Sequence, residues 1–235
     1  MVTIHDDARV KRGLRTQLAA RRKLLASGAR AIGWKIGFGA PAAMAKLGIT
    51  APLTGFMMDR NLVASGATVS LAGWSKALAE MEIAVHMGRD LGAGASRSVV
   101  VNSIAALGPA IELADLDAPP NDPEAILSGN IYHRHVILGP RDDRRAGAIL
   151  DDWSGRVSRN GNEEAHVSDL EANTGLLLDL VTHVAATLSA EGERLRAGDV
   201  VICGSVIPPI ELGDQDREVA FSLDPGEWAC SVRFT

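Results

Sequence analysis

Two glutamates placed two positions apart, Glu80 and Glu82, have the types and spacing to do chemistry. Every odd position over residues 79–87 is apolar, and this alternation is typical of a half-buried strand, on which residues two apart share a face. Neighbouring carboxylates repel each other and lose hydration when they are covered. A cation bound between them would stabilise the pair in a cleft. The alternative is a solvent-facing strand edge with two solubilising acids.

Three further charged residues stand in runs that are otherwise apolar. Lys35 lies in the glycine-laced strand predicted over residues 31–39, where a lysine must reach solvent, pair with an acid or lose its proton. Asp59 closes the apolar run 52–61, and Glu112 stands alone among apolar neighbours, so it is either exposed or paired. Lys35 and Asp59 could serve only the fold, because ion-pair networks also place charges among apolar residues.

The histidines and cysteines do not suggest a soft-metal site. His133 and His135 share a face of the strand predicted over residues 131–139, but no third soft ligand is nearby, so we expect both at the surface. Cys203 and Cys230 form no CxxC pair and have no histidine at zinc spacing. We expect them to be core thiols rather than parts of a disulfide or zinc site.

Hydrophobic periodicity predicts the elements that must position these residues. Helices are expected over residues 6–27, 41–47, 96–107 and 174–190, the first with an Arg/Lys outer face and the last packed in the core. Gly108 and Pro109 are expected to end the third helix. Strands are expected over residues 31–39, 52–61, 77–90, 110–115 and 131–139, then a hairpin over 155–167, a strand ending at Gly204-Ser205, and two strands around 224–226.

Composition narrows the class of protein. The 235 residues are 46% apolar and 23% charged, which is ordinary for a globular domain with a sizeable core, and no segment looks like a linker. The net charge of −5 gives no indication of nucleic-acid binding. No apolar run is long enough to span a membrane, and the polar N-terminus lacks a signal-peptide core. We therefore expect a single cytoplasmic domain.

Taken together, these segments resemble the fumarylacetoacetate hydrolase superfamily. Within it, they resemble the branch of 2-hydroxypenta-2,4-dienoate (2-keto-4-pentenoate) hydratases and 4-oxalocrotonate decarboxylases. The match runs from about Ile32 to the C-terminus, and order and spacing agree over most of the chain. It is carried by Gly33-Trp-Lys-Ile-Gly37, Gly55-Phe-Met-Met-Asp59, Glu80-Met-Glu-Ile-Ala84, Gly88-Arg-Asp90, Pro109-Ala-Ile-Glu112 and Leu195-Arg-Ala-Gly-Asp199 through Gly204-Ser205.

The resemblance implies a role for each candidate residue. It assigns Mg²⁺ or Mn²⁺ to Glu80, Glu82 and Glu112, proton transfer to Lys35 and Asp59, and substrate binding to Asn130, Gly204 and Ser205. The third acid being Glu, where the hydrolase branch usually has Asp, favours the hydratase side. This chain departs from the usual hydratase pattern in its shorter N-terminus, at Gly39, at residues 128–130 and at residues 171–173.

The resemblance also implies the fold and the assembly. The expected fold is α+β, a mostly antiparallel twisted β-roll with flanking helices. We expect one catalytic domain over residues 1–235, made of a helical arm over 1–30 and a β-roll core over 31–235. Members of the family form dimers or larger assemblies, so a homo-oligomer is expected.

The predicted chemistry follows from the residue types. Three carboxylates make an all-oxygen site suited to Mg²⁺ or Mn²⁺, with positions left for a 2-oxo acid and water. We predict a hydratase that adds water to a small 2-hydroxy-2,4-dienoate and gives a 4-hydroxy-2-oxo acid. The same site would suit a 2-oxo-enedioate decarboxylase or an acylpyruvate-type C–C hydrolase. An alternative of another class is a non-catalytic binding subunit.

Overall fold

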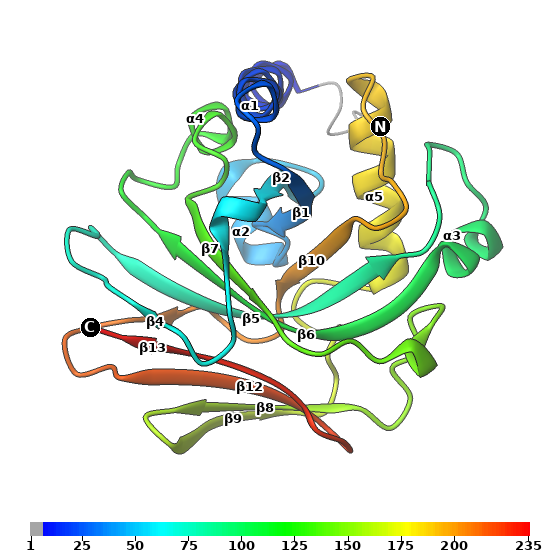
Figure 1. The fold of residues 1–235 in the computed structure, drawn as a ribbon. Coiled ribbons are helices and arrows are strands. Elements are labelled where there is room, and N and C mark those ends of the chain that lie inside the picture. The colour runs from blue at the N-terminus through cyan, green and yellow to red at the C-terminus, as the bar shows by residue number, and fades with distance from the viewer. Residues whose placement is uncertain (1–6) are drawn as a thin grey trace.

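The computed structural model describes residues 7–235 and shows two β-sheets and a set of helices (Figure 1). The larger sheet has the strand order β2-β1-β10-β5-β6-β7-β3, with β11 paired to β5, and the smaller has the order β4-β13-β12-β8-β9. The helices α1, α4 and α5 lie on one side of β5 and β6, and the smaller sheet lies on the other.

The strands and helices occupy the following ranges. The larger sheet is built from β1 (Ala31–Gly37), β2 (Leu53–Met58), β3 (Leu62–Val63), β5 (Ala77–Met87), β6 (Ile104–Asp115), β7 (His133–Leu138), β10 (Val200–Ser205) and β11 (Ile210–Glu211). The smaller is built from β4 (Thr68–Val69), β8 (Ser154–Arg159), β9 (Asn162–Val167), β12 (Glu218–Asp224) and β13 (Trp228–Phe234). The helices are α1 (Ala8–Ala26), α2 (Pro41–Leu47), α3 (Arg97–Ser103), α4 (Pro123–Ser128) and α5 (Leu177–Ala190).

The strand pairing is mostly antiparallel. Among the described strands, the parallel pairs are β1 with β10, β3 with β7 and β4 with β13. Both sheets are curled, and the helices flank the larger one. The α+β class and the mostly antiparallel β-roll predicted from the sequence are confirmed.

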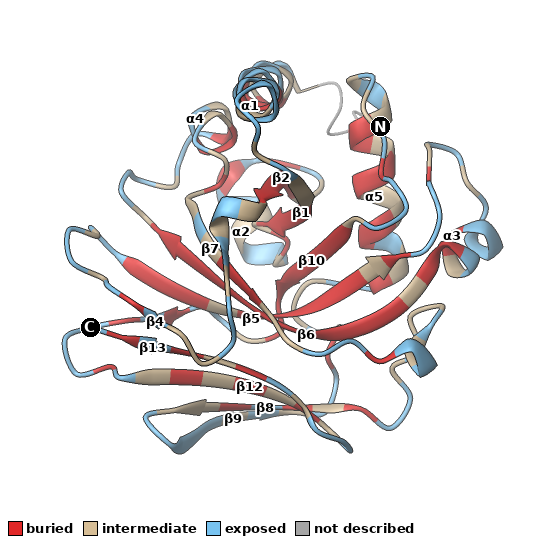
Figure 2. Ribbon diagram, in the orientation of Figure 1, coloured by how far each residue is buried: buried red, intermediate tan, exposed pale blue. Residues whose placement is uncertain are grey.

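The central strands β5 and β6 are buried on both faces (Figure 2). Odd-numbered residues of β5, such as Met81 and Ile83, belong to the main core with Phe221 and Val232 of the smaller sheet. The even-numbered face carries Ala84 and contributes to a second apolar cluster with Met57, Ala110, Val136, Val200 and Ile202. The face that carries Glu80 and Glu82 is therefore inside the protein and not a solvent-facing strand edge.

The helix predicted over residues 96–107 is too long, and this prediction is wrong at its C-terminal half. Helix α3 ends at Ser103, and β6 begins at Ile104 and runs through Gly108 and Pro109 without interruption. Gly108 is needed inside the strand because a side chain there would lie 2.6 Å from the carbonyl oxygen of Pro140. Gly108 and Pro109, which resembled the end of a helix, therefore lie inside a strand that packs closely against a neighbouring loop.

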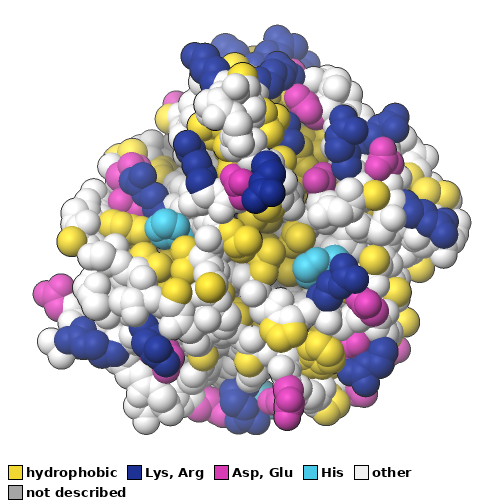
Figure 3. All heavy atoms as spheres, in the orientation of Figure 1, with side chains coloured by type: hydrophobic (Ala, Val, Ile, Leu, Met, Phe, Trp, Pro, Cys, Tyr) yellow, Lys and Arg dark blue, Asp and Glu magenta, His cyan; other side chains and the backbone are white. Residues whose placement is uncertain are grey.

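Helix α1 packs as the sequence predicted, although Asp6 of the predicted range lies outside the described residues. Its buried residues include Leu14 and Leu18, and the buried Gln17 donates a hydrogen bond to the carbonyl of Leu127 at 3.1 Å. Lys and Arg side chains gather at the top of the view, where α1 lies (Figure 3). No helix within residues 7–235 is both long and apolar enough to cross a membrane.

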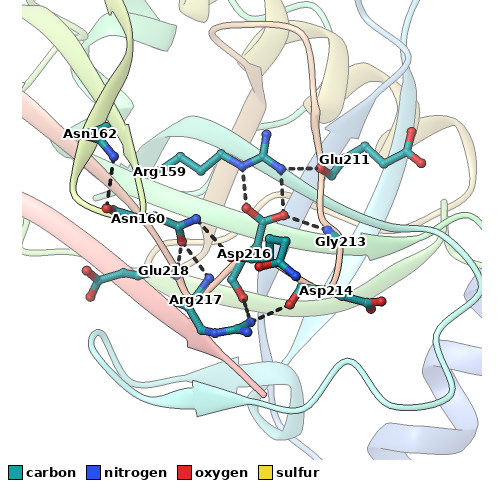
Figure 4. A network of polar contacts seen from close by, with 10 residues as sticks. Arg159, Asn160, Asn162, Glu211, Gly213, Asp214, Asp216, Arg217 and Glu218 are labelled. Atoms are coloured by element: carbon teal, nitrogen blue, oxygen red, sulfur yellow. Dashed lines mark hydrogen bonds and ion pairs between the residues drawn. The ribbon is translucent and has the colours of Figure 1, made fainter.

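The predicted hairpin over residues 155–167 is confirmed as β8 and β9, and a polar network fixes its turn (Figure 4). Asp216, buried in the loop before β12, accepts hydrogen bonds from Arg159 at 2.7 Å and from the Gly213 amide at 2.7 Å. The side chain of Asn160 accepts from the amide of Arg217 at 2.7 Å. These contacts join the hairpin turn to the loop between β11 and β12.

Candidate metal centre

Three glutamates converge on the inner face of the larger sheet. Glu80 and Glu82 stand two apart on β5, and Glu112 of β6 is the register partner of Glu80. One carboxylate oxygen from each of the three lies within 4.8 Å of the others. Glu82 and Glu112 are fully buried, and Glu80 is half-buried. The structure thus brings together the three acids that the sequence analysis selected as metal ligands.

Two of these buried oxygens have no hydrogen-bond partner among the described residues. They are Oε1 of Glu82 and Oε2 of Glu112. A buried carboxylate oxygen left without a partner costs free energy, and a divalent cation would remove that cost. An all-carboxylate donor set suits Mg²⁺ or Mn²⁺ rather than a soft metal. The residues present therefore fit a divalent cation.

The pKa values of the three acids move in different directions. Burial, with the charge of Glu112, raises the pKa of Glu80 to about 7. Burial and the charges of the other two acids raise the pKa of Glu82 well above its ordinary value. Burial also acts to raise the pKa of Glu112, but Lys35 and His133 outweigh it, and the pKa is lowered. Glu112 is therefore the acid that stays ionised most readily.

Lys35 is a buried lysine paired with an acid. Its Nζ donates hydrogen bonds to Oε1 of Glu112 and, at 3.1 Å, to the carbonyl of Ile131. The side chain is 1% exposed. Gly55 lies opposite it on β2, and a side chain there would come within 2.8 Å of Cγ of Lys35. A glycine on the neighbouring strand thus leaves room for the lysine to lie across the sheet.

His133 also contacts Glu112, which corrects the expectation that both histidines lie at the surface. Its Nδ1 lies 2.7 Å from Oε1 of Glu112, and its side chain is 1% exposed. A register shift in the β6–β7 pairing aligns His135 with Leu113 but His133 with Ala114. The two histidines therefore face opposite sides of the sheet, and His135, which is half-buried, stacks on Trp74. The sequence does not show this bulge, so the prediction of a shared face was wrong.

Asp59 does not meet Lys35 at the site. It accepts hydrogen bonds from the side chain and the amide of Arg30, both at 3.0 Å, and these lower its pKa. Gly55 is the β2 residue opposite Lys35. Asp59 lies four residues beyond Gly55 along the chain, which is roughly 13 Å from Gly55 at the rise of a strand. It is not among the residues that line the cavity. The register of β1 and β2 is not visible in the sequence, and Glu112 takes the place beside Lys35 that was expected for Asp59.

A cavity of about 220 Å³ lies beside the cluster and is lined by Lys35, Gly204, Ser205 and, of the three acids, Glu80. Gly204 has a positive φ of 82° and donates its amide hydrogen to Oε2 of Glu82. The Ser205 hydroxyl is buried without a partner among the described residues. Of the pair expected to bind a carboxylate, Ser205 therefore has a free polar group, whereas the Gly204 amide is used by Glu82.

Asn130 holds the backbone and does not line the cavity. Its side-chain amide accepts from the amide of Phe56 and donates to the carbonyl of the same residue, both at 2.9 Å. Asn130 adopts a positive φ of 56°, a conformation in which asparagine is enriched. Its observed contacts thus support strand β2 beside Lys35.

Two cavity residues were not selected from the sequence. Asn173 donates to the carbonyl of Ser205 at 2.7 Å, and Thr174 donates to the carbonyl of Cys203 at 3.1 Å. Both hold the end of β10 in place beside Glu82. No motif marks them, because their partners are backbone carbonyls some thirty positions away.

Comparison with known proteins identifies the family. The family model described as the C-terminal domain of fumarylacetoacetate hydrolase matches residues 35–228. The chain belongs to this family, as the resemblance predicted.

Several curated proteins are similar over nearly the full chain. The 2-hydroxyhexa-2,4-dienoate hydratase of Comamonas testosteroni is 30% identical, covering 98% of this chain and 88% of that protein. A 4-oxalocrotonate decarboxylase of Pseudomonas sp. is 24% identical, covering 90% and 80%. The solved structure of 4-oxalocrotonate decarboxylase from Pseudomonas putida G7, complexed with magnesium and adipate, has a TM-score of 0.85 at 24% identity, covering 95% and 85%. At that identity the structural similarity establishes the fold alone.

Proposed function

We propose that this protein is a metal-dependent hydratase that adds water to a small 2-hydroxy-2,4-dienoate and gives a 4-hydroxy-2-oxo acid. The observation that carries the proposal is the cluster of Glu80, Glu82 and Glu112, with two buried carboxylate oxygens left unpaired, beside a cavity that Glu80 lines. The similarity to a dienoate hydratase over 98% of the chain supports the reaction. The cavity is smaller than a drug-sized site, in agreement with a small substrate.

Glu80, Glu82 and Glu112 would hold the cation, which we propose to be Mg²⁺ or Mn²⁺. When bound, it supplies a positive charge that polarises the 2-oxo group of the substrate. The chain contributes the rest of the site. The Ser205 hydroxyl, which has no partner among the described residues, is available to donate a hydrogen bond to the substrate carboxylate.

We assign proton transfer to Lys35 alone. An ammonium group has three hydrogens, and Lys35 uses two of them on Glu112 and the carbonyl of Ile131. The third is available to the cavity that Lys35 lines. Asp59 is not part of this proposal, because its contacts are with Arg30 and Arg60.

The test is turnover by the purified full chain with Mg²⁺ or Mn²⁺. Loss of the conjugated diene of 2-hydroxypenta-2,4-dienoate should be seen with either cation and abolished by a chelator. Glu82→Gln should remove the activity, whereas Glu218→Gln, at a position on β12 away from the cavity, should keep it. Absence of turnover with every divalent cation would contradict the proposal.

A decarboxylase of 2-oxo-enedioates is the second candidate. It is favoured by the 24% identity to a 4-oxalocrotonate decarboxylase over 90% of the chain. Release of CO₂ from a 2-oxo-enedioate, without hydration of the dienoate, would select it. Cleavage of an acylpyruvate would select the C–C hydrolase. Binding of the cation and a 2-oxo acid without any turnover would select the non-catalytic binding subunit.

The assembly and the location stay predictions. The resemblance implies a homo-oligomer, which sedimentation of the purified chain would reveal. The cytoplasm is proposed from the composition, which is ordinary for a globular protein.

A further inference from the structure

A second cavity, of about 300 Å³, lies between helices α1 and α5 at the start of strand β2. Helix α1 contacts β2, and helix α5 contacts β1 (Figure 1). At the rim, Arg15 of α1 is paired at 3.2 Å with Glu191, which follows α5. Within residues 7–235, this cavity has no lining residue in common with the cavity beside Glu80. It is therefore a separate cavity, which the proposed reaction does not use.

Strand β2 separates the two cavities. A side chain at Gly55 would meet Lys35, so Gly55 faces the side of the sheet that holds Lys35. Successive strand residues point to opposite faces, so Thr54 points away from Lys35. The β1 residue opposite Thr54 is two positions from Trp34, whose ring centroid lies 4.6 Å from the guanidinium carbon of Arg21 on α1. Thr54 therefore points toward the helices and into the second cavity, which it lines.

The hydroxyl of Thr54 is a buried donor without an acceptor. The residue is 2% exposed, and its Oγ1 has no hydrogen-bond partner in the part of the chain that the structure describes. A buried hydroxyl that is left unpaired costs free energy. An oxygen of a bound ligand would remove that cost.

A second hydroxyl, on α5, is also available to donate. Oγ1 of Thr187 lines the cavity and lies 3.4 Å from Nε2 of His183. That nitrogen is 2.8 Å from the carbonyl of Pro52, which only accepts, so the nitrogen carries the hydrogen. Toward His183, Thr187 can therefore only accept, and its own hydrogen has no acceptor among residues 7–235. The cavity thus offers two hydroxyl donors.

The third available donor is the ammonium group of Lys11. This half-buried residue lies on the face of α1 that lines the cavity. Its side chain has no ion-pair or hydrogen-bond partner within the described range. The other two ionisable residues of the lining, Arg15 and Glu191, are paired with each other. The charge of Lys11 is therefore uncompensated, and an anion would complement the cavity.

The remaining wall is apolar. It is formed by Val10, Leu14, Pro52, Leu53, Leu127 and Ala190. The valine and the leucines belong to the main core. An alkyl or aryl group placed against them would be removed from water, which stabilises binding. The lining thus offers donors and a positive charge to one end of a ligand and apolar surface to the rest.

We propose that the second cavity binds a monocarboxylic acid with an uncharged apolar body. The carboxylate pairs with Lys11 and accepts hydrogen bonds from Thr54 and Thr187, since its two oxygens have room for about four donors. The body packs on the leucines of α1, β2 and α4. Neither a metal nor a 2-oxo group is needed, so the inference goes beyond the proposed function and does not rest on it.

The test is an NMR titration of the full chain with hexanoate, which has a carboxylate and an apolar body but no 2-oxo group. The backbone amide signals of Leu14, Leu53 and Thr187 should shift saturably, with one dissociation constant of ~1 mM or lower. Hexan-1-ol, which lacks the charge, should bind at least ~10-fold more weakly. The dissociation constant of hexanoate should be the same with and without Mg²⁺, because the cavity shares no residue with the carboxylate cluster.

Three results of this titration would overturn the inference. The first is the absence of saturable shifts at Leu14, Leu53 and Thr187. The second is equal binding of hexanoate and hexan-1-ol. The third is a dependence on Mg²⁺ with shifts confined to Gly204 and Ser205, which would place hexanoate in the cavity beside Glu80.

Two variants test the donors. Thr54→Val keeps the shape of the side chain and removes the hydroxyl, and Lys11→Met removes the charge. Each should weaken hexanoate binding by ~10-fold, the usual effect of losing a hydrogen bond to a charged group. The matched control is Lys23→Met, at an exposed lysine of α1 outside the cavity, and it should bind hexanoate as the unaltered chain does.

Thermal unfolding separates ligand binding from a structural role. Thr54→Val removes an unpaired buried hydroxyl, so its melting temperature should be no lower than that of the unaltered chain. If Thr54→Val does not fold, Lys11→Met carries the test. Folded variants that bind hexanoate as tightly as the unaltered chain would overturn the inference. Hydration of the dienoate without hexanoate binding would overturn this inference alone, and hexanoate binding without hydration would support it while contradicting the proposed function.

Discussion

At the scale of single residues, Glu112 is the centre of the site. One of its oxygens accepts from Lys35 and lies beside His133, and the other is unpaired. Two donors on one oxygen leave the second oxygen oriented for a cation. Sequence reasoning selected Glu112 and Lys35 because each is a lone charge in an apolar strand. It could not select His133, because a strand pattern does not reveal which way a histidine beside a bulge will point.

Removing Lys35 should separate proton transfer from metal binding. Lys35→Met is expected to lower kcat by ~100-fold or more, the usual contribution of a positioned acid or base. The Mg²⁺ dissociation constant should stay within about three-fold, because loss of the hydrogen bond to Glu112 is offset by loss of a positive charge beside the cation. Steady-state kinetics give kcat, and calorimetry gives the Mg²⁺ dissociation constant. The control Lys76→Met removes a half-exposed lysine paired with Glu211 and should leave both unchanged. A lower melting temperature with kcat intact would show that Lys35 only supports the fold.

His133 should act on the cation through Glu112. His133→Ala is expected to weaken Mg²⁺ binding by ~10-fold or more, as loss of a residue that orients a ligand does, and His133→Gln should recover part of the affinity because an amide can donate to the same oxygen. The control is His135→Ala, on the other face of the sheet, which should leave the Mg²⁺ affinity unchanged. Equal loss in both histidine variants would contradict the positioning role.

At the scale of elements, the antiparallel pair of β5 and β6 holds the three acids in place. The alternation over residues 79–87 predicted β5, because a strand buried on one face by packing and on the other by a site still alternates apolar and polar residues. The start of β6 was missed. Its first residues read as a continuation of α3, and Gly108 with Pro109 resembled a helix end, because only the neighbouring loop at Pro140 explains why a glycine is required.

Gly108 should be sensitive to the smallest side chain. Gly108→Ala would place its Cβ 2.6 Å from a backbone carbonyl, which cannot move without moving the chain. We expect a loss of ~1–3 kcal/mol in the free energy of unfolding, as for other overpacked sites. Thermal unfolding should show a lower melting temperature than Gly92→Ala, because an added Cβ at Gly92 meets no heavy atom within 4 Å. A melting temperature equal to that of the control would contradict the tight packing of β6.

His86, on the same strand as the glutamates, should make stability depend on pH. Burial, helped by Arg141, lowers its pKa from 6.5 to about 4, so the folded protein favours the neutral ring. The stability that this provides is present above pH 6.5 and is lost as the pH falls toward 4. The melting temperature of His86→Gln should therefore decrease less between pH 7 and pH 4 than that of the unaltered chain. His166→Gln changes an exposed histidine and should show the same decrease as the unaltered chain. An unchanged acid profile in His86→Gln would contradict the burial.

At the scale of the whole molecule, the central strands of the larger sheet are buried between the smaller sheet and the flanking helices (Figure 2). The main core and a second apolar cluster form there, and Glu82 and Glu112 are fully buried. The overall fold could be predicted because the resemblance covers most of the chain, and the family match over residues 35–228 confirms it. The position of Asp59 could not, because it depends on the register between two strands and on the turn that closes them. The pattern of a single strand thus predicted β5, whereas the places of Asp59 and His133 depend on how neighbouring strands are aligned.

The measurement that tests the central claim most directly is Mg²⁺ binding by calorimetry to the unaltered chain and to Glu82→Gln. The unaltered chain should bind one cation saturably, and Glu82→Gln should lose that binding. The metal-free variant should stay folded, because burial raises the pKa of Glu82 and an uncharged side chain suits its site. Glu211→Gln, at an exposed acid, should bind as the unaltered chain does. Unchanged Mg²⁺ affinity in a folded Glu82→Gln would contradict the metal site and the function proposed from it.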